Sequence, residues 1–152
     1  MTEAGPTQMI MTPKRQWFAT AAYAALLAVG SLLPSGASAP LQWDAALTPS
    51  VQNALHLPAY AVLAVLVAAV RLRARPGGAA ATVICGAICA AYGTALELAQ
   101  ALIPGRTASL GDALANLAGV AVGVLAVTGW QRLRLHRASG GREGSPSPGP
   151  MG

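Results

Sequence analysis

The chain has 152 residues, of which 54% are hydrophobic and only 10% are charged, and its formal net charge is +5. Soluble domains carry about 25% charged residues, so this composition excludes an ordinary water-facing globule and predicts a membrane protein. The basic residues stand in short clusters beside apolar runs, without interleaved aromatic residues for stacking on bases. The positive charge therefore indicates membrane topology, and we expect a lipid bilayer and no nucleic acid as partner.

The N-terminal region combines a short tail with the first apolar run. Residues 1–13 are predicted to be a flexible tail, and Lys14 and Arg15 precede an uncharged run over residues 17–33. A basic start, an apolar middle and the small residues 37–39 are also typical of a signal peptide. However, the run is longer than a usual signal-peptide core, and Pro40 follows the cleavage position. We therefore predict a retained spanning helix.

Three further apolar runs complete the predicted bundle. They cover residues 55–70, 79–103 and about 110–130, and Pro58 is expected in the first turn of the second span. Cys85 and Cys89 are four residues apart on one helix face, which indicates small packing residues, so no metal site or cofactor is predicted. The fold class is thus an all-α integral membrane bundle of four transmembrane helices. It forms one domain over residues 14–137, followed by a disordered tail over 138–152.

The basic residues also predict an orientation. Nine of the ten Lys and Arg residues precede the first span, lie between the second and third, or follow the fourth, and only Arg106 lies on the other side. The positive-inside rule therefore predicts cytoplasmic N- and C-termini, in a multi-pass protein of the cell membrane.

Polar residues gather around the connection between the third and fourth spans. Glu97 is 18 residues past residue 79 and Asp112 is 18 residues before Trp130, so each lies ~27 Å from the inner boundary. His56 comes out at ~22 Å by the same reasoning. We expect one outward-facing polar cluster, with Arg106 placed to bridge the two carboxylates and the Gln100 and Asn116 amides satisfying their remaining lone pairs.

Helical spacing places these residues on shared faces. Asp112, Asn116, Gly119 and Gly123 share one face of the fourth span, and Gly119 and Gly123 form a GxxxG pattern. The third span carries a matching face of small and polar residues, consisting of Cys85, Cys89, Gly93, Glu97 and Gln100. We therefore expect the third and fourth spans to pack closely below the cluster. Tyr60 lies one turn from His56 and is expected to hydrogen-bond into the cluster, and Ser109 is expected to cap the fourth helix.

These residues resemble the VanZ-like family of small multi-pass membrane proteins. The resemblance covers roughly residues 50–127. Its main motif comprises Glu97, Gln100, Pro104, Gly105, Arg106, Ser109, Asp112, Asn116, Gly119 and Gly123. Upstream, His56 and Tyr60 match the family pattern, whereas Gln52 and Asn53 replace its acidic–basic pair. The resemblance implies a cell-envelope protein, in a family that includes the protein associated with low-level teicoplanin resistance.

Three interpretations of the polar cluster remain open at the level of sequence. The first is a site that binds an envelope lipid or cell-wall precursor, formed by Glu97, Gln100, Arg106, Ser109, Asp112, Asn116, His56 and Tyr60. The second is a membrane-embedded hydrolase or transferase, with His56, Glu97 and Asp112 as candidate catalytic residues. They would act by acid–base chemistry, or the two carboxylates would hold a divalent cation for metal-assisted chemistry. The third is a purely structural clamp between helices. Because the cluster lies near the edge of the bundle, a homo-oligomer that completes it is compatible with all three.

Overall fold

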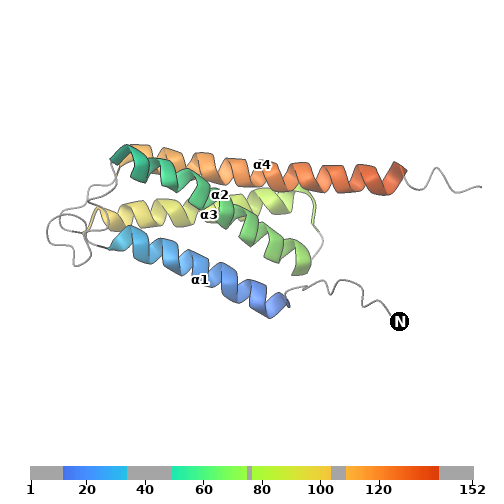
Figure 1. The fold of residues 1–152 in the computed structure, drawn as a ribbon, viewed down its shortest axis with the longest axis horizontal. Helices are drawn as coiled ribbons and strands as arrows, with labels where there is room; N and C mark the ends of the chain where they lie inside the picture. Colours follow the sequence, from blue (N-terminus) through green and yellow to red (C-terminus); the bar gives the residue numbers. More distant parts are fainter. Residues whose placement is uncertain (1–11, 34–48, 75–76, 104–108, 141–152) are drawn as a thin grey trace, which may run out of the picture.

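The structure, a computed structural model, describes residues 12–33, 49–74, 77–103 and 109–140. Within these ranges the protein is all-helical, and successive helices run in opposite directions along one bundle (Figure 1). The helices are α1 (Pro13–Leu32), α2 (Pro49–Ala74), α3 (Ala79–Gln100) and α4 (Leu110–Gly140).

Two of the helices begin at a proline. Pro13 and Pro49 are the first residues of α1 and α2, a position where the missing proline N–H has no intrahelical acceptor. Because α2 begins at Pro49, Pro58 lies inside the helix, and its predicted place in a first turn is wrong. The ring at Pro58 removes one intrahelical hydrogen bond, which membrane helices tolerate when neighbouring groups take up the freed carbonyl.

The closest packing in the bundle is between α2 and α4. Their contact is the most extensive of any helix pair, and α1 packs on α2 and α3 but not on α4. A Cβ atom on Gly119 would overlap the carbonyl oxygen of Leu57, and one on Gly123 would lie 2.6 Å from the oxygen of Ala61. The GxxxG pattern does allow close approach, but its partner is α2 and not the third span as expected. The small side chains of Ala61 and Ala64 on α2 make this approach possible.

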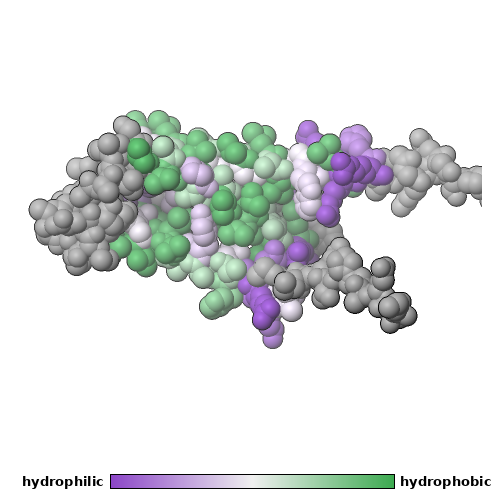
Figure 2. Space-filling model, in the orientation of Figure 1, coloured by the Kyte–Doolittle hydropathy of each residue, from purple (hydrophilic) through white to green (hydrophobic). Residues whose placement is uncertain are grey.

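The distribution of side-chain size matches a protein surrounded by lipid. Small residues such as Ala64, Ala68 and Cys89 fill the interior, whereas large apolar side chains point outward, with Phe18 77% exposed. The described outer surface is correspondingly hydrophobic over the body of the bundle (Figure 2). Small interior residues permit the close helix packing that membrane bundles use, and lipid covers the apolar exterior.

Three of the described helices have the length and apolar character of membrane spans. These stretches are Ala54–Ala74, Ala79–Gln100 and Leu110–Arg137. The helix α1 is not among them, because its uncharged stretch is short and Gln16, Thr20 and Tyr23 add polar groups. The structure thus supports a membrane protein with all-helical architecture, while a membrane span at α1 and the orientation of the protein stay predictions.

Within the described residues, three hydrogen bonds attach α1 to the other helices. The Tyr23 hydroxyl donates to the Ala59 carbonyl of α2 at 3.0 Å, and the Tyr92 hydroxyl of α3 donates to the Ala24 carbonyl at 2.6 Å. The third bond runs from Gln100 Nε2 to the Ser31 carbonyl at 2.8 Å. These bonds add to the apolar packing of α1 on the core, which Ala24 and Leu27 provide.

The two ends of the bundle differ in charge. The described basic residues lie at the beginning of α1 and at the ends of α2 and α4, and this end of the bundle is the hydrophilic one in Figure 2. They are Lys14, Arg15, Arg71, Arg73, Arg132, Arg134 and Arg137. We call this the basic end. There, the Arg134 guanidinium lies 3.8 Å from the centre of the Trp130 ring.

Candidate functional site

The polar residues of three helices meet toward the end of the bundle opposite the basic end. His56 lies in the first part of α2, Glu97 in the last turn of α3, and Asn116 in the second turn of α4. Because α3 runs opposite to α2 and α4, the end of α3 lies beside the beginnings of the other two (Figure 1). The antiparallel topology therefore brings together residues that are distant in sequence.

Asn116 joins the three helices through its side-chain amide. Its Nδ2 donates to Glu97 Oε1 at 3.2 Å, and its Oδ1 lies 2.9 Å from His56 Nδ1. An amide oxygen only accepts hydrogen bonds, so His56 Nδ1 carries the hydrogen in this arrangement. Asn116 is 3% exposed. We call these three residues the His56–Asn116–Glu97 network.

The Glu97 carboxylate is buried with one oxygen unsatisfied. The residue is 6% exposed, and Oε2 has no hydrogen-bond partner among the described residues. Asp112 and His56 lie close enough to act on the carboxylate electrostatically, and the backbone of Ser109 also interacts with it. Burying a polar atom without a hydrogen-bond partner lowers the stability of the folded protein. The unpartnered Oε2 of Glu97 therefore needs an explanation.

Tyr60 supports the His56 ring. The two rings are nearly parallel, with an interplanar angle of 6° and centroids 6.4 Å apart. Tyr60 is 2% exposed and packs over Gly93 of α3, where an added Cβ would lie 2.7 Å from Cε1 of the ring. No described residue bonds to the Tyr60 hydroxyl, so its expected hydrogen bond into the cluster is not seen in this part of the chain. Its observed contribution is packing.

The beginning of α4 is capped as the sequence predicts. Ser109 Oγ accepts a hydrogen bond from the Asp112 backbone N–H at 3.4 Å, and the Ser109 carbonyl accepts one from the Ala113 N–H at 3.1 Å. Asp112 lies in the first turn of α4, where a carboxylate interacts favourably with the helix dipole. This geometry directs the start of α4 toward Glu97.

Gln100 and Arg106 were both expected at the carboxylates. Gln100 was expected to satisfy the carboxylates, but its Nε2 donates to Ser31 of α1 instead. The reason is that α1 ends beside the last turn of α3 and offers a carbonyl there. Arg106, the expected bridge between Glu97 and Asp112, lies outside the described residues, as do Pro104 and Gly105.

Sequence reasoning missed two contacts. The first is the direct bond between His56 and Asn116, which depends on the rotation of α2 against α4. The second is the attachment of α1 through Tyr23 and Tyr92. A phenol inside an apolar run is a usable signal for such a bond, because a hydroxyl in lipid needs a partner.

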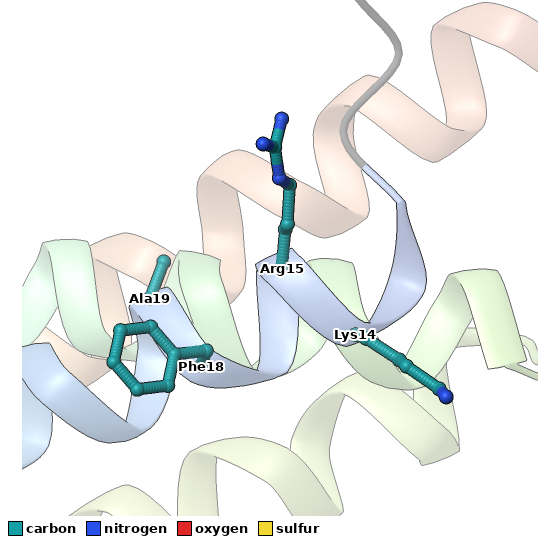
Figure 3. Close-up of a pocket in the computed structure, with 4 residues that line it drawn as sticks. All are labelled: Lys14, Arg15, Phe18 and Ala19. Carbon is teal, nitrogen blue, oxygen red and sulfur yellow. The ribbon is translucent and has the colours of Figure 1, made fainter.

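An open pocket lies near the beginning of α1. It is lined by Lys14, Arg15, Phe18 and Ala19, whose side chains point in different directions, with Lys14 and Arg15 directed apart (Figure 3). The lining groups do not converge on a common point, so this hollow carries no site. Among the described residues there is also no group of three or more His, Cys, Asp or Glu that is placed to hold a metal ion.

Together, the fold and the network define a multi-pass helical membrane protein with a buried polar network near one end. Residues 6–131 match the model of the VanZ/LLP1 family. The chain therefore belongs to this family, and the match also includes α1, which precedes the region that carries the resemblance in sequence. Neither the curated proteins nor the solved structures contain a match to the chain.

Proposed function

We propose that this VanZ/LLP1-family protein engages the headgroup of an envelope lipid or a cell-wall precursor at the His56–Asn116–Glu97 network. The observation that carries the proposal is the buried Glu97 carboxylate with an unsatisfied Oε2 among the described residues. A network that only held helices together would be expected to satisfy both oxygens. Ionisable groups inside membrane proteins are costly and usually functional.

The position of the network supports a headgroup ligand. The network lies toward the end opposite the basic end, and the positive-inside rule predicts that this end faces outward. An outward polar site at the edge of the hydrocarbon region lies at the level of lipid headgroups. We assign Asp112, Ser109 and Tyr60 to its surroundings, and Arg106, between α3 and α4 in sequence, to an anionic part of the ligand.

A structural clamp is the second candidate function. The observation in its favour is that Asn116 donates to Glu97 and accepts from His56, which connects α2, α3 and α4 directly. The two candidates differ in what Glu97→Gln does. Glutamine keeps an oxygen that can accept from Asn116, so a clamp survives this change, whereas a ligand that needs the carboxylate is lost.

The test compares the parent protein with Glu97→Gln, His56→Ala and Thr94→Ala after purification in mild detergent. Thr94 is the matched control, because it lies one turn from Glu97, is exposed and bonds only to its own helix at Ala90. Mass spectrometry identifies retained lipids and precursors, and thermal unfolding reports stability.

We expect Glu97→Gln to reduce the retained headgroup by about tenfold with little change in unfolding temperature, since it removes one charged hydrogen-bond acceptor. Thr94→Ala should behave like the parent. If no headgroup is retained even by the parent and His56→Ala lowers the unfolding temperature, the network is a clamp. Turnover of a retained headgroup that stops in His56→Ala would identify a hydrolase or transferase, with Glu97 or Asp112 as the acidic partner.

A further inference from the structure

The orientation of the Asn116 amide determines which atoms the network presents to a ligand. Its Nδ2 is used by the Glu97 carboxylate, which accepts hydrogen bonds when ionised, so its Oδ1 must face His56. An imidazole that donates from Nδ1 carries no hydrogen on Nε2 when the ring is neutral. No described residue bonds to Nε2, which leaves it as a hydrogen-bond acceptor.

Glu97 supplies the second acceptor. Its Oε1 is taken by Asn116, while Oε2 is buried and without a partner among the described residues. The described part of the site therefore offers two hydrogen-bond acceptors, which favour a ligand group that donates hydrogen bonds.

We infer that Asn116 fixes His56 with its hydrogen on Nδ1, and that His56 Nε2 and Glu97 Oε2 together select a ligand group that donates hydrogen bonds, an ammonium or a hydroxyl. This inference rests on the proposed function and names the chemistry of the headgroup. Asn116 is a positioning residue, because it acts through His56 and Glu97. Tyr60, parallel to the His56 ring, helps to hold the imidazole in place.

The first test is the protonation of His56, observed by nitrogen NMR on protein labelled with ¹⁵N-histidine. The chain has two histidines, so a His136→Gln background leaves His56 as the single signal. At a pH where the ring is neutral, we expect hydrogen on Nδ1 and a non-protonated Nε2. Asn116→Leu should give a mixture of the two tautomers, and a parent ring with its hydrogen on Nε2 would overturn the inference.

The second test uses three phospholipids that share a phosphate and differ in their donors. Phosphatidylethanolamine offers an ammonium, phosphatidylglycerol offers hydroxyls, and phosphatidylcholine offers neither. The protein is extracted from vesicles that contain the three in equal amounts, and retained lipid is counted by native mass spectrometry. We expect ethanolamine or glycerol lipid to exceed choline lipid by about tenfold, as a charged hydrogen bond would give.

Glu97→Gln shows whether lipid selectivity depends on the carboxylate. This variant tests the inference even if Asn116→Leu does not fold. Selectivity that disappears in Glu97→Gln supports the inference, and the preferred lipid shows whether the donor is an ammonium or a hydroxyl. Equal retention of all three lipids that still depends on Glu97 overturns the inference but leaves the proposed function intact. If lipid retention is the same in Glu97→Gln as in the parent, the lipid binds at another place, such as the basic end. This result overturns both the inference and the proposed function.

Discussion

Side chains that donate to backbone carbonyls help to hold α1 against α2 and α3. Tyr92 makes the shortest of these bonds, to Ala24. Hydrogen bonds between membrane helices contribute about 0.6 kcal/mol on average and up to about 1.7 kcal/mol. We expect Tyr92→Phe to lower the free energy of unfolding by an amount in this range, measured by denaturation in detergent. Tyr60→Phe is the control, because no described residue bonds to its hydroxyl, and equal losses in both variants would contradict the assignment.

The residues of the candidate site were largely predictable, but their partners were not. Helical periodicity places Asn116 and Glu97 on the inner faces of their helices, and both are buried. Periodicity within one helix does not determine the rotation of a helix about its axis relative to its neighbours, which decides that Asn116 meets His56. Gln100 illustrates the same limit, because its partner is a carbonyl of α1, and a carbonyl leaves no trace in the sequence.

At the scale of helices, Gly119 controls the approach of α4 to α2. An alanine methyl at this position overlaps the Leu57 carbonyl, a backbone atom that cannot rotate away. We expect Gly119→Ala to lower the free energy of unfolding by about 1–3 kcal/mol, the usual cost of overpacking. Thermal or chemical unfolding in detergent measures the loss.

Gly129→Ala provides the matched control for Gly119→Ala. It lies on the same helix, and an added Cβ there meets nothing within 4 Å. We expect no destabilisation, because alanine is the better helix former. If Gly129→Ala destabilised the protein as much as Gly119→Ala, close packing against α2 would not be the cause.

The length of the apolar runs predicts the helices themselves. It does not predict which helices pack against each other. The second predicted span is extended at both ends in α2, and α4 continues past residue 130 to Gly140. Polar residues such as Gln131 and Arg134 continue a helix easily outside the hydrocarbon region, so hydropathy marks the membrane boundary and not the helix end. The GxxxG pattern likewise predicts a close approach without naming the partner, here α2.

For the whole molecule, the decisive prediction is its topology. Cysteines are introduced as Lys14→Cys, Leu110→Cys and Arg137→Cys, in a background where Cys85 and Cys89 are alanine. Positive-inside orientation with four spans predicts that a membrane-impermeant maleimide labels only Leu110→Cys in intact cells. Lys14→Cys and Arg137→Cys should react after the membrane is opened. Labelling of both Lys14→Cys and Leu110→Cys from outside would show that α1 does not cross the membrane.

The attachment of α1 also has an evolutionary consequence. In each of its three bonds the donor is a side chain and the acceptor is a main-chain carbonyl, at Ala24, Ser31 or Ala59. Every amino acid carries that carbonyl, so the residues at the acceptor positions can be substituted without loss of the bond. The donor side chains must be kept. Paired substitutions among homologous sequences, which reveal contacts between side chains, will therefore not reveal these three bonds.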